Sequence, residues 1–346
     1  VADGNLVDWT QYNRITFVSL AVWVAIVAGL VTLVARRPRV GRAVVAVASV
    51  VLIIVQSAGV VDIVAKAESE PTEKGIFDVS AKKNVVCFVL DMTDTADAEK
   101  AFADNPAMLD GLDGFTWYQN SVGSMIPTRY GIPSLLTGVR PKPGEDAADF
   151  LANMYTSSYF LDDVAAQGYT TGVYSDTAGW IDGWDGYLGQ RVENFESTSE
   201  VAKQTLDWQG TLSILYRCAL YRDLPWVSKP FFWFYTDQIN QGMVSSASAS
   251  SPDVTPYAMD DPAYFAKLKE SGLTTNDEDA SFRFIHLIGT HWPYIMDADG
   301  NKVPESSDWE SQMVGAFKIV RTYLDELKRL GLYDSTTVVI TADHGT

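Results

Sequence analysis

The stretch Asn84-Val-Val-Cys-Phe-Val-Leu-Asp91 is a continuous apolar run that ends in a carboxylate. Such a run, without alternating polar residues, is typical of a strand buried on both faces of a parallel sheet. Phe282–Ile288 and the β-branched run Thr336–Thr341 repeat the pattern, and Tyr169–Tyr174 and Phe115–Val122 are predicted as further strands. Strands that alternate with helices predict an α/β sandwich with a largely parallel central sheet.

The helices are predicted between these strands. Asp97–Leu109 and Trp309–Leu330 are predicted helical, the latter from apolar residues recurring at helical spacing. Glu145–Gln167 is predicted helical with a break around Tyr155–Ser158. In the middle of the chain, Phe231-Phe-Trp-Phe-Tyr235 is predicted as core, with contact to a membrane surface as the alternative.

Polar residues with catalytic or metal-binding chemistry follow three of the predicted strands. Asp91 ends the first, His291 follows the second, and Asp343-His344 follow the last. Functional residues of open parallel sheets collect at the carboxyl ends of the strands. We therefore expect these side chains along one edge of the sheet.

Two uncharged runs precede the sheet, Ile15–Ala35 and Ala43–Val61, and four arginines lie between them. Each run is close to the roughly 20 residues that a bilayer-spanning helix needs. The sequence therefore predicts two transmembrane helices, and a buried helical hairpin is the alternative. Because Arg36, Arg37, Arg39 and Arg42 favour a cytoplasmic position, both chain ends are predicted to be extracytoplasmic.

The charge of the chain divides at the end of the second run. Residues 1–65 carry five Arg and three Asp, a net of +2, and the remainder carries 21 basic and 41 acidic residues, a net of −20. Nucleic acid is an unsuitable partner for so acidic a domain. We predict a membrane anchor over residues 1–65, a polar linker over 66–83 and a catalytic domain over 84–346. The protein is thus predicted to be a multi-pass protein of the cell membrane whose catalytic domain lies outside the cytoplasm.

Asp343-His344 pairs an oxygen ligand with a nitrogen ligand, which suits zinc or manganese. A helix-capping Asp beside a solvent-facing His would give the same pattern. Asp91 has the same alternative, since Asp after a strand often caps the next helix. Asp94, or else Asp97, is better placed to cap, which leaves Asp91 available as a metal ligand.

Pro127-Thr-Arg-Tyr-Gly-Ile-Pro-Ser-Leu-Leu-Thr-Gly138 is the most specific segment. It resembles the nucleophile segment of the alkaline phosphatase/sulfatase superfamily, in which a nucleophile precedes a short helix that ends in a Thr-Gly or similar pair. Thr128 lies nine residues before Thr137, the offset of the modified residue of sulfatases. It also lies five before Pro133, which is similar to phosphoethanolamine transferases. A helix N-terminus beside Thr128 would favour a phosphate anion, whereas an ordinary N-cap is the alternative.

Ile285-His-Leu-Ile-Gly-Thr-His-Trp-Pro-Tyr294 resembles the segment of the same families in which a His before an aromatic residue and Pro lines the substrate site. The resemblance implies that His291 binds a substrate oxygen or protonates the leaving group. His286 lies inside the predicted strand, and we predict a packed core histidine there.

With its two predicted membrane helices, the chain is similar to lipoteichoic acid synthases and related phosphoglycerol transferases. The resemblance implies one divalent ion (Mn, Zn or Mg, with Ca as a further candidate) held by Asp91, Thr128, Asp343 and His344. It implies a transferase that moves a phospho-alcohol group from a phospholipid donor to a glycolipid or cell-envelope polymer through Thr128. A membrane-bound hydrolase of phosphodiesters or sulfate esters, and a non-enzymatic binding module, are the alternatives.

The sequence departs from the sulfatase pattern at two positions. Met125 stands where sulfatases carry the Cys or Ser that becomes formylglycine, and Met92 stands where they place a second Asp. Both differences favour phosphoryl chemistry on an unmodified threonine. The family's fold continues beyond the His344 motif, so we expect this sequence to be a piece of a longer protein.

Overall fold

The computed structural model describes residues 8–51, 69–177, 183–197, 205–233, 244–245, 255–303 and 307–345. The chain divides into two compact units. The sheet unit comprises Ser69–Ala202 and Ala249–Thr346, together with Val1–Asn5, and the helical unit comprises Leu6–Glu68 and Lys203–Ser248. The predicted limits at residues 65 and 83 stay predictions. The structure adds that residues 203–248 are grouped with the N-terminal segment.

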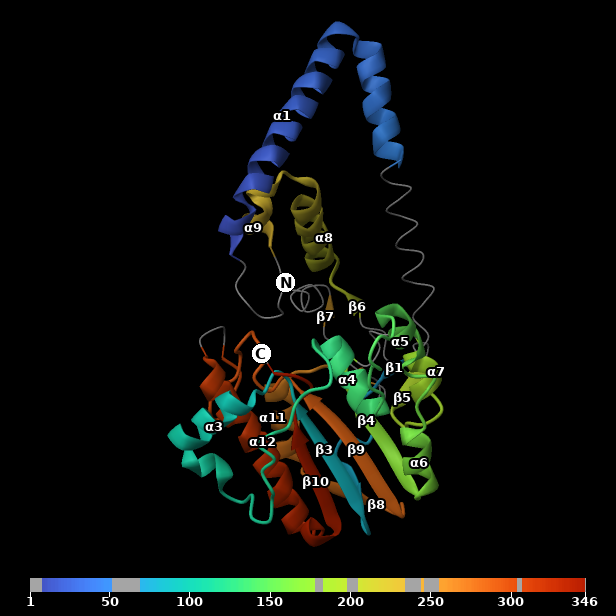
Figure 1. Ribbon diagram of the computed structural model, residues 1–346, viewed down its shortest axis with the longest axis vertical. Helices are drawn as coiled ribbons and strands as arrows, with labels where there is room; N and C mark the ends of the chain where they lie inside the picture. The colour runs from blue at the N-terminus through green and yellow to red at the C-terminus, as the bar shows by residue number, and fades with distance from the viewer. Residues whose placement is uncertain are drawn as a thin grey trace. The chain divides into compact units, whose positions relative to one another are not determined.

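The sheet unit is built on a four-stranded sheet in the order β10-β3-β9-β4 (Figure 1). The strands are β3 (Asn84–Leu90), β4 (Tyr169–Tyr174), β9 (Ala280–Leu287) and β10 (Thr336–Thr341). Every pairing is parallel, as the unbroken apolar runs predict. The α/β fold with a parallel central sheet is therefore confirmed.

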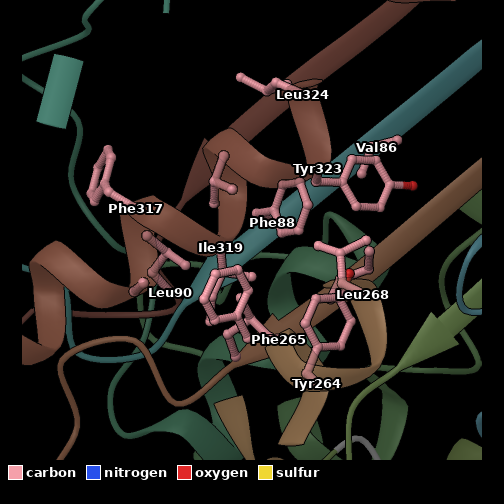
Figure 2. Packing of buried hydrophobic residues seen from close by; sticks show 14 of the residues in the cluster. Val86, Phe88, Leu90, Tyr264, Phe265, Leu268, Phe317, Ile319, Tyr323 and Leu324 are labelled. Atoms are coloured by element: carbon pink, nitrogen blue, oxygen red, sulfur yellow. The ribbon is translucent and has the colours of Figure 1, made fainter. Parts of the chain in front are cut away.

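Side chains of β3 alternate between two hydrophobic cores, because successive residues of a strand point to opposite faces of the sheet. Val86, Phe88 and Leu90 belong to the first core. The first core is covered by α3 (Thr95–Asp104), α11 (Asp261–Ser271) and α12 (Trp309–Arg329). Figure 2 shows Phe88 and Tyr323 within this core, where their rings meet edge to face with centroids 5.1 Å apart.

Val89, on the opposite face of β3, belongs to the second core. The helices of that face are α4 (Thr128–Thr137), α5 (Ala147–Asn153), α6 (Phe160–Ala166) and α7 (Trp184–Leu188) (Figure 1). The gap between α5 and α6 confirms the predicted helix break. The sandwich therefore closes both faces of the sheet and leaves its strand ends for polar groups.

Short elements complete the sheet unit. β1 (Ser69–Pro71) pairs with β5 (Phe195–Ser197), and β2 (Asp78–Ser80) pairs with β8 (Thr274–Asn276). Two 3₁₀ turns, η2 (Pro106–Leu109) and η6 (Tyr333–Ser335), flank α3 and β10.

The predicted strand Phe115–Val122 is wrong, because these residues form turns and irregular backbone. Phe115 packs against the first core, and the Trp117 ring meets Phe102 edge to face at 5.4 Å. Val122 is 91% exposed. Apolar side chains that pack one at a time do not need a neighbouring strand, and this segment has none.

The helical unit begins with η1 (Trp9–Tyr12) and α1 (Asn13–Arg36), and residues 38–51 are also helical. Its second part contains α8 (Trp208–Asp223), η4 (Trp226–Ser228), α9 (Lys229–Phe232) and the pair β6 (Thr205–Leu206) with β7 (Val244–Ser245). Among the described residues, one helix, Trp9–Arg36, is long and apolar enough to cross a membrane. The second predicted span reaches past residue 51 and so lies partly outside the described residues.

Candidate metal centre and active site

Two carboxylates meet at the carboxyl ends of the adjacent strands β3 and β10. Asp91 directly follows β3, and Asp343 lies two residues after β10. Both are buried. The backbone N–H of Met92 donates to Asp343 Oδ1 at 3.2 Å, which ties the two strand ends together. The sequence-based expectation that these residues share one sheet edge is therefore met in the structure.

Thr128 is the first residue of α4, and its side chain points at this edge. Its Oγ1 lies 3.0 Å from His344 Nε2 and donates to Asp91, whose two carboxylate oxygens lie 3.3 and 3.4 Å away. Pro127 is the N-cap residue, so Thr128 does not have the capping role that the sequence left open. Asp94 caps α3 by accepting from the Ala96 N–H, so Asp91 does not cap that helix. Asp91 instead lies with Thr128, Asp343 and His344 in a cluster at the sheet edge.

Two glycines allow the backbone segments to approach so closely. A Cβ at Gly131 of α4 would lie 2.7 Å from the Asp343 carbonyl oxygen, and a Cβ at Gly289 would lie 2.5 Å from the Asp91 nitrogen. Gly289 also has a φ of 57°, a left-handed backbone conformation that residues with a Cβ rarely adopt. The cluster is therefore assembled by close backbone contacts among four segments distant in sequence, those around Asp91, Gly131, Gly289 and Asp343.

His286 is a site residue that the sequence reasoning missed. It is completely buried in β9, as expected of a core histidine. However, its Nε2 lies 3.6 Å from Asp91 Oδ2. Single ligand atoms of Asp91, His286 and Asp343 all lie within 4.8 Å of one another. Burial inside a strand and ligation at a strand end give the same sequence pattern, so only the register of β9 against β3 distinguishes them.

Both histidines of the cluster have their second ring nitrogen engaged. His344 Nδ1 lies 2.7 Å from the Gly345 carbonyl, which can only accept, so Nδ1 carries a proton and Nε2 faces Thr128 Oγ1. His286 Nδ1 lies 3.0 Å from the Ser175 hydroxyl. Hydrogen bonds of this kind orient the imidazoles of metal sites.

The electrostatics of this cluster suit a bound cation. Burial, and then the Asp343 charge, raise the pKa of Asp91 well above its usual value. Burial lowers the pKa of His286. His286 Nε2 and Asp343 Oδ2 are buried without a hydrogen-bond partner among the described residues. Unsatisfied buried polar atoms are rare and costly. Two carboxylates together with imidazole nitrogens form a donor set that suits a divalent metal ion.

His291 lies in the loop after β9, beside this cluster. The neighbouring Thr290 N–H donates to the Asp91 carbonyl at 2.9 Å, and the His291 carbonyl accepts from Gln312 Nε2 at 2.8 Å. The His291 charge acts to lower the pKa of Asp91, although burial outweighs it. The structure thus brings His291 to the same sheet edge, and its role with substrate stays a prediction.

The Ser134 hydroxyl and the Arg129 guanidinium, which lie near Thr128 in the sequence, have other contacts. The Ser134 hydroxyl lies 2.6 Å from the Ser124 hydroxyl and donates to the Val139 carbonyl at 3.2 Å. The exposed Arg129 guanidinium lies over the Tyr130 ring, 4.8 Å from its centroid. The Thr128 hydroxyl contacts both Asp91 and His344.

No protein-family model and no curated protein matches the sequence. Among solved structures, the chain is similar to a protein in the alkaline phosphatase superfamily from Vibrio parahaemolyticus, with 14% sequence identity and a TM-score of 0.39. The match covers 80% of this chain and 57% of that chain. A likeness of this size does not assign the chain to a family.

Proposed function

We propose that this protein is a metal-dependent phosphotransferase of the alkaline phosphatase superfamily, with Thr128 as its nucleophile. The observation that carries the proposal is the Thr128 hydroxyl, held by Asp91 and His344 beside two buried polar atoms that lack hydrogen-bond partners among the described residues. Support also comes from the order of the motifs along the chain, from Asp91 through Thr128 and His291 to Asp343-His344.

Asp91, His286 and Asp343 would hold the metal, with Thr128 and His344 adjoining them. The mixture of imidazole and carboxylate favours zinc or manganese, whereas magnesium and calcium prefer oxygen donors alone. A divalent ion there would offset charge on a phosphate and make the Thr128 hydroxyl easier to deprotonate.

The chain's own groups account for the bond changes. The Thr128 hydroxyl proton passes to one of its hydrogen-bond acceptors, Asp91 or His344 Nε2. Thr128 Oγ1 then forms a bond to phosphorus as the bond from phosphorus to the lipid alcohol oxygen breaks. His291 supplies a proton to that leaving oxygen. In the second step an acceptor hydroxyl loses its proton to His291 and attacks the phosphorus, and Thr128 Oγ1 leaves and takes its own proton back from the cluster.

The helical unit supports a lipid donor. Trp9–Arg36 could anchor the enzyme in a membrane, where phospholipids are donors at high local concentration. We propose a second span over Ala43–Val61 and an extracytoplasmic catalytic unit, because Arg36, Arg37, Arg39 and Arg42 lie between the two runs. A glycolipid or cell-envelope polymer would be the acceptor.

Incubation of the full chain with phospholipid labelled in the headgroup phosphate tests the nucleophile. We expect label on Thr128 by peptide mass spectrometry, its loss in Thr128→Ala, and partial turnover in Thr128→Ser, which keeps the hydroxyl. Ser134→Ala is the matched control, and it should keep the label. Labelled peptide from Thr128→Ala, with metal still bound, would contradict the mechanism.

The fate of the phosphate separates transfer from hydrolysis. With a glycolipid acceptor present, we expect the label on the acceptor. Release of the label only as soluble alcohol phosphate would favour the hydrolase alternative while leaving the nucleophile in place.

A further inference from the structure

α8 exposes a continuous apolar stripe. Trp208, Leu212, Leu215 and Tyr216 recur at helical spacing and are 68%, 63%, 52% and 67% exposed. The stripe occupies one side of the helix. Gln209, Ser213 and Arg217, also exposed, follow a different side, and the buried Thr211 lies on a third. Phe231 of α9 extends the exposed apolar surface, at 80%.

The segment that follows α8 packs on the start of α1, within the same unit. The Trp226 N–H donates to the Ser19 hydroxyl at 3.1 Å, and the Trp226 and Tyr12 ring centroids lie 5.2 Å apart. Trp233 meets Trp9 edge to face at 5.5 Å. A groove of about 410 Å³ also lies between the first turns of α1 and Trp226.

This aromatic cluster lies at the end of α1 remote from Arg36. Tryptophan and tyrosine concentrate where a membrane-spanning helix leaves the hydrocarbon for the headgroups. The window of α1 that could span a membrane is wholly unburied, so its surface is available to lipid. The cluster fixes residues 226–233 to this helix end, and α8 leads directly into them.

The charge of the segment differs from that of the chain. Residues 208–233 contain three basic residues, Arg217, Arg222 and Lys229, and one acidic residue, Asp223, a net of +2. The whole chain has a net charge of −18. They also include seven aromatic residues: Trp208, Tyr216, Tyr221, Trp226, Phe231, Phe232 and Trp233. Basic and aromatic residues beside exposed apolar side chains are features of segments that bind the membrane–water interface.

We propose that residues 208–233 bind the membrane–water interface, with the stripe of α8 immersed at the boundary of anionic headgroups and acyl chains. The element lies inside the sequence of the catalytic domain rather than at its end, so it gives that domain a second attachment to the surface. The proposal rests on α1 spanning the membrane, and it is independent of the chemistry at Thr128.

A fluorescent probe at single cysteines tests the immersion. The full chain is reconstituted into vesicles of phosphatidylcholine and phosphatidylglycerol, with Cys87 and Cys218 replaced by alanine. An environment-sensitive nitrobenzoxadiazole label is attached at Leu212→Cys on the stripe. Ser213→Cys on the polar side is the matched control, and Val24→Cys in α1 is the control for the span. Quenching is measured with lipids brominated on their acyl chains.

At Leu212→Cys we expect blue-shifted emission and loss of about half of the intensity with brominated lipid, since interfacial helices bury their apolar face only 5–10 Å deep. Ser213→Cys should keep emission typical of water and little quenching. Water-like emission at Leu212→Cys, equal to that at Ser213→Cys, would overturn the proposal. Blue-shifted emission without quenching would also overturn it, because protein rather than lipid would then cover the stripe. Absence of quenching at Val24→Cys would overturn the spanning helix on which it rests.

Discussion

The two units of this protein break the usual distribution of polar and apolar groups in opposite ways. The sheet unit buries Asp91, Asp343 and His286 together, whereas the helical unit exposes Trp208 and Leu212. Each departure costs free energy in an isolated chain in water. The comparison teaches that the chemistry of a misplaced group indicates the kind of partner it suits, and we propose a cation for the buried cluster and lipid for the exposed stripe.

Burial alone is insufficient for this inference, as Asp261 shows. It is also buried in the sheet unit, yet it accepts from the Ile288 and Gly289 N–H groups at 2.8 and 3.1 Å. Its charge therefore has partners within the protein. Asp343 Oδ2 and His286 Nε2 have no hydrogen-bond partner among the described residues, and this difference separates a structural carboxylate from a candidate ligand.

The largest effect we expect is a pH dependence from Asp261. Burial raises its pKa from the ordinary value of 3.8 to about 7, although the backbone hydrogen bonds act to lower it. The folded state holds the Asp261 proton more tightly than the unfolded state does. The stabilisation that this proton gives is therefore complete below the unfolded pKa and is lost as pH rises through about 7. Relative to Asp261→Asn, wild type should lose roughly 4 kcal/mol of unfolding free energy between pH 4 and 7. Urea unfolding across this range measures it, and a constant difference would contradict the burial argument.

A second prediction compares leucines of the two units directly. Leu268 in the first core is 1% exposed, and Leu212 of α8 is 63% exposed. Leu268→Ala should cost about 3 kcal/mol of unfolding free energy in detergent solution, because it leaves a cavity. Leu212→Ala should cost under about 0.5 kcal/mol. Equal costs in denaturant titrations would mean that the stripe is covered by protein.

A third prediction concerns the backbone that assembles the cluster. Gly289→Ala would place a Cβ 2.5 Å from the Asp91 nitrogen at a φ of 57°, and we expect a loss of about 2–3 kcal/mol. Gly138→Ala is the matched control, since Gly138 has a φ of 68° with no atom within 4 Å of its added Cβ. It should lose only about 1 kcal/mol. Similar thermal shifts for both variants would show that the close approach at Gly289 is unimportant.

The strand ends were the most predictable part of the molecule. Asn84–Leu90 and Thr336–Thr341 match the predicted strands. An uninterrupted apolar run indicates a buried strand, and the polar residue that follows it indicates the edge of the sheet. His286 could not be assigned from sequence, since its approach to Asp91 depends on the register of β9 against β3, which pairs Val89 with His286. The grouping of residues 203–248 with α1 is likewise a long-range contact that no local pattern encodes.

The central claim is that the cluster at the ends of β3 and β10 holds a divalent metal ion. Elemental analysis of the purified full chain, after equilibration with zinc or manganese and removal of free metal, tests it most directly. We predict one ion per chain in wild type, and loss of the ion in Asp91→Asn combined with Asp343→Asn. Asp261→Asn, which alters a buried carboxylate with protein partners, should retain the ion. Wild type without metal, or a double variant with unchanged metal content, would contradict the account.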